Sequence, residues 1–341
     1  MNTKRTCSTI AGALLACLLA APAALADGCM IAPWEYEIHE TEQLAYLSWD
    51  ADAGREELHI LPKFYGDTQN FAWIVPVPGL PELEVSSVDI FRSLANLTAP
   101  EYRHRDRGWS CNESQFSPDT AGAPNDGVDI IDEQLVGMYQ TMTVGADDAG
   151  ALTDSLTAWG FLHDGNIDEV APLLASYVDE DWYFVTLKVD STAFAEPQYD
   201  WYWYGGMQPI RLVFDTESPV YPMRISALSA VDDTSVTLYV DAGRRMDFAG
   251  AETLYANALT IREKRAVDAR YPSLAPLLGE GRFLTKLRRL YAPDQMNADV
   301  HLVSASSNAE YHRIYYSGLP MTMGLMLGTA GLLFFRRRKR N

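Results

Sequence analysis

The sequence predicts a strand-rich α+β domain that is exported by an N-terminal signal peptide and held in a membrane by one C-terminal helix. Three observations lead to this prediction: apolar segments at both ends of the chain, strand-like apolar runs between residues 42 and 240, and short amphipathic helices among them. Strands and helices come in runs without strict alternation, which is typical of α+β folds with a mixed core. Residues 27–318 suffice for one large core or two modest ones, with a possible division near residue 145.

The first 26 residues have the three parts of a secretory signal peptide. Lys4 and Arg5 precede an apolar stretch over residues 10–20, and small residues follow at positions 24 and 26. We therefore expect cleavage between Ala26 and Asp27. The apolar stretch is too short to cross a membrane, which argues against an N-terminal anchor.

Residues 319–335 carry no charge and are followed by a basic cluster. Their length is at the lower limit for a helix that crosses a hydrocarbon core about 30 Å thick. Basic residues beside a span stay in the cytoplasm, so we expect a single-pass protein of the cytoplasmic (inner) membrane with its large domain in the periplasm or cell exterior. A sorting tail cut off after export is the alternative. The predicted cytoplasmic tail, residues 336–341, contains the stop-transfer residues Arg336, Arg337, Arg338, Lys339 and Arg340.

The domain between these ends is strongly acidic. All 46 Asp and Glu lie in it, whereas two of the 27 Lys and Arg lie in the signal peptide and five in the tail, which leaves 20 bases and a formal net charge of −26. Such a surface repels nucleic-acid phosphates, so no nucleic-acid binding is expected. It suits basic or cationic partners, although solubility outside the cytoplasm explains it more simply.

Two cysteines, Cys29 and Cys111, remain once the signal peptide is removed. In an oxidising compartment two cysteines most simply form one disulfide, which would tie the new N-terminus to the polar loop over residues 103–129. A two-cysteine metal site is the alternative, but no nearby His or carboxylate spacing supports it.

Hydrophobic periodicity places the elements of the domain. A Ser86 or Ser87 cap begins a short helix that carries Ile90, Phe91 and Leu94 at helical spacing. The prolines from Pro76 onward are expected to end the strand before them. Residues 48–77 are predicted to be β structure, and residues 42–49 are an apolar-polar mixture that leads to a turn. Predicted strands cover residues 57–64, 71–75, 134–144, 182–189, 208–214, 223–228 and 235–240, and predicted helices cover 147–159, 167–177 and, in pieces, 271–291.

Residues 61–100 contain the most distinctive pattern. The segment 71–78 reads Phe-Ala-Trp-Ile-Val-Pro-Val-Pro, and a Phe91-x-x-Leu94 helix follows it. With these motifs the chain resembles the bacterial family catalogued as domain of unknown function 2330. The resemblance implies an exported, often membrane-anchored protein and carries no catalytic residue with it. Further matching segments are Cys29, 152–161, 177–185, 209–214, 221–224 and 283–287.

Motifs for metal, cofactor or nucleophilic chemistry are missing from the sequence. No two of the six histidines have metal-ligand spacing, and there is no Gly-x-Ser-x-Gly and no phosphate-binding glycine loop, so no cofactor is expected. Residues 164–169 are similar to a calcium loop but lack the glycine and closing glutamate that it needs. A helix cap at Asp164 or Asn166 is the preferred interpretation.

Residues 199–204 are unusually aromatic. In an extended chain, Tyr199, Trp201 and Trp203 would share one face. Exposed rings in such a row stack on sugars or anchor a protein, whereas packing into the core is the structural alternative. A basic cluster of Arg282, Lys286, Arg288 and Arg289 either meets lipid head groups or offsets nearby acids; we prefer the second interpretation.

Together these patterns favour a binding or scaffolding module of the bacterial cell envelope, with another envelope protein or a glycan as its partner. The alternative is an envelope hydrolase with a site assembled from scattered Asp, Glu and His side chains. Convergent polar groups with perturbed pKa values would favour the enzyme, and exposed aromatic rings would favour binding.

Overall fold

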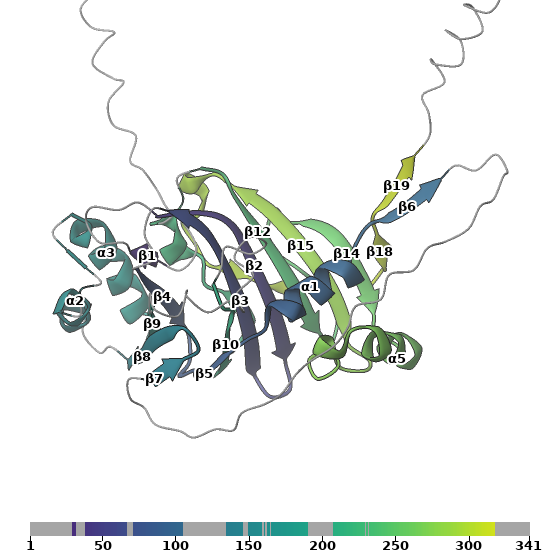
Figure 1. Ribbon diagram of the computed structural model, residues 1–341, viewed down its shortest axis with the longest axis horizontal. Helices are drawn as coiled ribbons and strands as arrows, with labels where there is room; N and C mark the ends of the chain where they lie inside the picture. The colour runs from purple at the N-terminus through teal and green to yellow at the C-terminus, as the bar shows by residue number, and fades with distance from the viewer. Residues whose placement is uncertain are drawn as a thin grey trace, which may run out of the picture.

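The computed structural model describes residues 29–31, 38–66, 71–104, 134–145, 149–158, 160, 162–163, 165–189, 207–228, 230 and 232–317. In this part, two β-sheets pack face to face and helices cover the outer face of each, so that the molecule has four layers (Figure 1). Strands from before and after residue 145 are paired in both sheets.

The larger sheet has eight strands in the order β18-β14-β15-β12-β2-β3-β10-β5. All neighbours are antiparallel except β2 and β12, which pair in parallel although almost 200 residues separate them. The strands are β2 (Ile38–Asp50), β3 (Arg55–Gly66), β5 (Glu82–Val85), β10 (Ile210–Asp215), β12 (Thr234–Ala242), β14 (Glu252–Ala258), β15 (Phe283–Tyr291) and β18 (Tyr311–His312).

The smaller sheet has five antiparallel strands in the order β1-β4-β9-β8-β7. They are β1 (Cys29–Ile31), β4 (Ala72–Val77), β7 (Gln134–Val136), β8 (Tyr139–Gly145) and β9 (Tyr183–Val189). Three further pairs of short strands are β11 (Val220–Tyr221) with β16 (Val300–His301), β13 (Met246–Asp247) with β17 (Val303–Ser304), and β6 (Glu101–His104) with β19 (Ile314–Ser317).

Four α-helices lie in the described part. α2 (Ala149–Ala158) and α3 (Ile167–Val178) cover the smaller sheet, and α1 (Val88–Leu97) and α5 (Ile261–Arg270) cover the larger one (Figure 1). The Ser87 side chain caps α1, and a Thr260–Glu263 capping box begins α5. Short 3-10 helices are η2 (Arg224–Ala227), η3 (Pro272–Leu274) and η4 (Pro293–Gln295).

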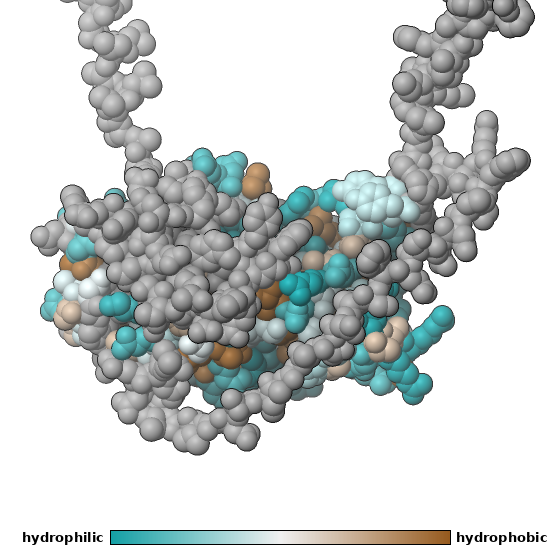
Figure 2. Space-filling model, in the orientation of Figure 1, coloured by the Kyte–Doolittle hydropathy of each residue, from teal (hydrophilic) through white to brown (hydrophobic). Residues whose placement is uncertain are grey.

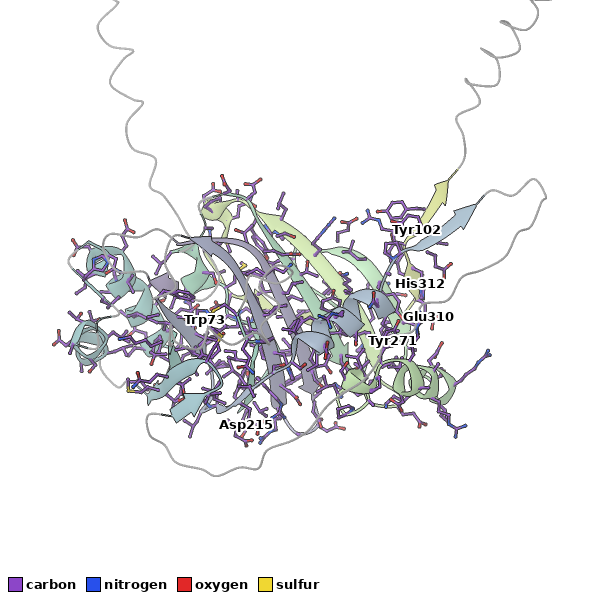
Figure 3. The ribbon with its side chains drawn as sticks, in the orientation of Figure 1. Trp73, Tyr102, Asp215, Tyr271, Glu310 and His312 are labelled. Carbon is purple, nitrogen blue, oxygen red and sulfur yellow. The ribbon has the colours of Figure 1, made fainter. Side chains whose placement is uncertain are left out.

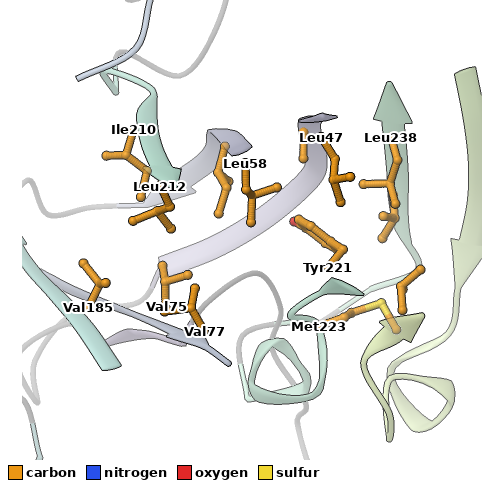
Figure 4. Close-up of a cluster of buried hydrophobic side chains, with 14 of the residues drawn as sticks. Leu47, Leu58, Val75, Val77, Val185, Ile210, Leu212, Tyr221, Met223 and Leu238 are labelled. Atoms are coloured by element: carbon orange, nitrogen blue, oxygen red, sulfur yellow. The ribbon is translucent and has the colours of Figure 1, made fainter. Parts of the chain in front are cut away.

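The main core fills the space between the two sheets. Leu47 and Leu58 from the larger sheet face Val75 and Val185 from the smaller one, and Tyr221 closes the side (Figure 4). Trp73 on β4 is completely buried in this layer. Side chains of this kind each contribute about 1.5–3 kcal/mol when they leave water, so this double-sheet interior is the principal source of stability.

The predicted α+β class is confirmed, and several element predictions are wrong. Residues 223–228 contain η2 in place of a strand, and residues 283–291 form β15 in place of a helix. Residues 134–144 contain a hairpin, because Gly137 turns the chain between β7 and β8. Pro76 does not end β4 as predicted, because the strand continues to Val77. Proline has no N–H to donate, but β1 pairs only with residues 72–74 of β4, so Pro76 lies beyond that pairing.

Candidate functional site

A transverse row of polar and aromatic side chains crosses the outer face of the larger sheet. Residues directly opposite each other on paired strands share a face, so the strand register brings distant parts of the chain together. The row runs, strand by strand, through Lys286, Tyr239, Tyr46, His59, Arg211 and Glu84. His59 is its centre: the Tyr46 ring meets the imidazole edge-on, with the ring centroids 5.5 Å apart.

His59 joins a serine to a glutamate by hydrogen bonds. Its Nδ1 lies 2.6 Å from Ser86 Oγ, and its Nε2 lies 2.9 Å from Glu57 Oε1. Glu57 and His59 share a face because they are two residues apart on β3. Ser86 lies between the end of β5 and the Ser87 cap of α1, and its N–H donates to the Pro209 carbonyl at 2.7 Å.

The charge on Glu57 fixes the direction of these hydrogen bonds. Burial alone would raise the pKa of Glu57, but hydrogen bonds from His59 and Arg211 hold that pKa at about 2. Glu57 is therefore an ionised acceptor at neutral pH, so His59 Nε2 carries a proton that it donates to Glu57. With neutral imidazole, Nδ1 is then the acceptor and Ser86 is the donor.

Arg211 neutralises the acidic side of the cluster. Its Nε donates to Glu57 Oε1 at 2.7 Å, and its second nitrogen donates to Glu84 Oε2 at 2.7 Å. Arg211 and Glu57 are both about one quarter exposed, so solvent screens this pair only in part. The guanidinium holds β3, β10 and β5 together beside His59.

A second polar cluster lies on the same face around Asp241. Arg282 Nε donates to Asp241 Oδ2 at 2.6 Å, and another guanidinium nitrogen donates to the Asp241 and Trp49 carbonyls. Burial raises the pKa of Asp241 to about 7 although Arg282 opposes the shift. Glu57 also raises that pKa, so the two carboxyl groups are electrostatically linked.

The predicted basic cluster offsets acids and carbonyls of the larger sheet. Arg282 pairs with Asp241, and Arg288 pairs with Glu252 at 3.0 Å. Arg289 donates to the Ala249 carbonyl, and the Lys286 ammonium lies 4.9 Å from the centre of the Tyr239 ring. These contacts agree with the preferred interpretation of the sequence.

A third polar network connects α3, η2 and the segment before β16. Asp299 Oδ1 accepts hydrogen bonds from Tyr177 Oη at 2.7 Å and from the N–H groups of Met223 and Arg224. Arg224 donates to both oxygens of Glu180 and lies 4.1 Å from the centre of the Tyr177 ring. The N–H groups of Met223 and Arg224 therefore have a carboxylate partner in place of a neighbouring strand.

Exposed tyrosines gather at one end of the molecule, where β6 and β19 project beyond β18 (Figure 1). We call Tyr102, Tyr311 and Tyr315 the tyrosine arm; their exposed fractions are 72%, 41% and 43%. The rings of Tyr102 and Tyr315 stack with centroids 5.4 Å apart. Figure 3 labels Tyr102 and His312 at this end, and pale side chains of intermediate hydropathy gather there in Figure 2.

Most of the predicted site residues lie outside the described part of the chain. These are the cleavage pair Ala26 and Asp27, the disulfide partner Cys111, the aromatic residues Tyr199, Trp201 and Trp203, and the tail residues Arg336 to Arg340. Cys29 begins β1 opposite Ile74. Asn166 stands at the predicted cap position of α3, but its side chain makes no capping hydrogen bond with that helix and instead accepts from the His163 N–H.

The described residues form neither a metal-binding cluster nor a helix that could cross a membrane. No group of three His, Cys, Asp or Glu side chains in these ranges is placed to hold a metal ion. No helix among these residues has the length and apolar character to cross a membrane. Residues 319–335 lie outside them.

Sequence comparison decides the family. A model described as "Uncharacterized protein conserved in bacteria (DUF2330)" matches residues 21–303. The chain belongs to this family. No curated protein matches it. Among solved structures, the crystal structure of baculovirus P35 matches with a TM-score of 0.34 and 12% identity over 84% of this chain and 100% of that chain. These values are too low to relate this DUF2330 member to P35 in fold or activity.

Proposed function

We propose that this DUF2330 protein is a membrane-anchored module of the bacterial cell envelope whose large domain, outside the cytoplasm, binds or scaffolds an envelope protein or a glycan. The observation that carries the proposal is the tyrosine arm. Tyrosine supplies a large, rigid and amphipathic contact surface, and few torsions are frozen when it binds. Stacked rings also suit the apolar faces of sugars.

The place of the arm in the chain connects it with the predicted anchor. β19 ends at Ser317, two residues before the apolar segment 319–335. A helix that begins there would hold the arm close to the membrane, where tyrosines are frequent at the interface with water.

Photo-crosslinking in intact cells tests the binding role. A benzophenone amino acid replaces Tyr102 in one strain and Leu290 in another; Leu290 is 59% exposed on β15 and serves as the matched control. We expect crosslinked products at position 102 and none at position 290. Equal yields at the two positions, or no product at either, would contradict the assignment of the arm.

Glycan binding separates the two kinds of partner. The purified full-length protein in detergent is applied to a glycan panel beside a Tyr102→Ala/Tyr315→Ala variant and a Trp201→Ala/Trp203→Ala variant. Loss of glycan signal in either variant identifies the rings that stack on sugar, and an unchanged signal in both excludes these aromatics as glycan contacts.

The anchor is tested separately by fractionation. We expect the full chain to stay with membranes after carbonate extraction and a chain that ends at residue 318 to be released. Mass spectrometry of the mature protein should find Arg336 to Arg340, and their absence would support the cut sorting tail instead.

A further inference from the structure

We propose that Ser86, His59 and Glu57 form a serine acyl-hydrolase site that cleaves short, polar carboxylic esters. This activity goes beyond the binding role above and does not depend on it. Three observations carry the proposal: the hydrogen-bonded order of the three side chains, the short strand-to-helix connection that holds Ser86, and neighbouring N–H groups without a partner among the described residues.

The hydrogen bonds have the order that a nucleophile, base and acid require. Ser86 Oγ lies 2.6 Å from His59 Nδ1, and His59 Nε2 lies 2.9 Å from Glu57. An ionised Glu57 keeps the proton on Nε2, so Nδ1 is free to take the hydroxyl proton of Ser86. His59 is 2% exposed, which fixes its ring, whereas Ser86 remains partly exposed to solvent.

Ser86 stands in a two-residue connection between a strand and a helix. β5 ends at Val85, and α1 begins at Val88 after the Ser87 cap. The Ser87 side chain caps the Asp89 N–H, and the Ile90 N–H donates to the Ser87 carbonyl. Within the described residues, the N–H groups of Ser87 and Val88 have no partner, and they lie at the positive end of α1. Such donors suit an oxyanion.

The reaction uses only these groups and water. Ser86 Oγ attacks the ester carbonyl carbon while His59 Nδ1 takes the hydroxyl proton. The bond to the leaving oxygen breaks, His59 returns the proton to the departing alcohol, and the acyl group remains on Ser86 as an ester. Water then loses a proton to His59 Nδ1 and attacks the carbonyl carbon of this ester. The bond between the acyl carbon and Ser86 Oγ breaks, the carboxylic acid leaves, and His59 returns the proton to Ser86 Oγ, which restores the hydroxyl.

The surroundings of Ser86 favour small polar substrates. Glu84, Ser87 and Asp89 lie around it in sequence and are exposed, and Arg211 pairs with Glu84. Charged and hydroxyl groups give no apolar wall for a long acyl chain. Short acyl esters are therefore the expected class.

Covalent labelling of the full-length protein in detergent tests this site. We expect a fluorophosphonate probe to leave one adduct, which peptide mapping places on Ser86, and the protein to hydrolyse p-nitrophenyl acetate. Ser86→Ala should remove the adduct and lower the hydrolysis rate by at least about 10²-fold. The control Ser235→Ala changes a half-buried serine elsewhere on the larger sheet. It should keep the adduct on Ser86 and the wild-type hydrolysis rate.

Two further variants separate the roles. His59→Gln should lose the adduct, because glutamine cannot act as the base. Glu57→Gln, at a positioning residue, should lower kcat and leave KM unchanged. An unlabelled wild-type protein, an adduct on another residue, or hydrolysis that survives in Ser86→Ala would overturn the proposal; the wild-type mapping decides the question even where a variant fails to fold.

Discussion

Tyr177 shows how one side chain can hold three segments of this protein together. Its hydroxyl donates to Asp299 at 2.7 Å and accepts from the Ile225 N–H at 3.1 Å, and the ring lies beneath the Arg224 guanidinium. Tyr177 is completely buried, so without these contacts its hydroxyl would have no hydrogen-bond partner, neither protein nor water.

Removal of that hydroxyl should destabilise the fold. Tyr177→Phe keeps the ring but leaves the Ile225 N–H and one Asp299 bond unsatisfied, so we expect the free energy of unfolding to fall by about 1–3 kcal/mol. Urea denaturation of the full-length protein in detergent measures this free energy. Tyr315→Phe, on the exposed tyrosine arm, is the control and should stay within about 0.5 kcal/mol of wild type. Equal effects would contradict the role of the network.

The candidate site was only partly visible in the residues themselves. Glu57 and His59 have the spacing of two side chains on one face of a strand, and Ser86 and Ser87 were alternative caps for the same helix. Because Ser87 takes the cap, Ser86 is left to bond with His59. Arg211 reaches Glu57 from more than 150 residues away, so no local pattern could have joined them.

At the scale of elements, local periodicity predicted the strands and helices with a strong apolar pattern. α3 and β9 lie close to their predicted bounds, and α1 begins directly after one of the two predicted caps. α5 was missed because Val267 is its one buried residue, so the helix has no apolar stripe that periodicity could detect. The Thr260–Glu263 capping box was a usable signal for its start. β15 was predicted as helical because basic residues interrupt the alternation of apolar and polar side chains that is typical of a strand. Pairing with β12 and β14 makes this segment a strand.

The β7–β8 hairpin gives a test at this scale. Gly137 has a φ of 61°, and a β-carbon there would lie 2.0 Å from Gln208 Oε1 and 2.7 Å from the Val85 side chain. Gly137→Ala is therefore expected to cost about 1–3 kcal/mol of unfolding free energy. Gly243→Ala, where a β-carbon meets nothing within 4 Å, is the control and should be nearly neutral. Equivalent stability of the two variants in urea denaturation would refute this account of the turn.

The whole molecule depends on contacts that sequence periodicity does not contain. The parallel pairing of β2 with β12 places residues 42–48 beside 235–241, and that pairing aligns the row through Tyr46 and Tyr239. Strand alternation tells which side chains share a face, but it does not tell which strands are neighbours. The α+β class could therefore be predicted, whereas the four-layer order and the clusters at His59, Asp241 and Asp299 could not.

Three carboxyl groups make the stability of the whole molecule depend on pH in opposite directions. Burial raises the pKa of Glu56 well above its ordinary value and that of Asp241 from 3.8 to about 7. In each case the unfolded chain ionises first, so stability decreases as pH rises above the unfolded pKa; for Asp241 this decrease extends from about pH 4 to about pH 7. The net charge of −26 on residues 27–318 acts in the same direction through self-repulsion. Glu57, with its pKa lowered from 4.5 to about 2, contributes stability that is lost as pH falls through that range.

These signs predict maximum stability between about pH 4 and 5, with a decline on both sides. Urea denaturation of the full-length protein in detergent at a series of pH values should show this maximum. Asp241→Asn should flatten the slope between pH 4 and 7, because each unit of pKa difference corresponds to about 1.4 kcal/mol. Glu57→Gln should flatten the acid side. Asp215→Asn, at a carboxylate 82% exposed, should follow the wild-type curve. A wild-type maximum at neutral pH, or an unchanged slope in Asp241→Asn, would show that burial of Asp241 does not control the response.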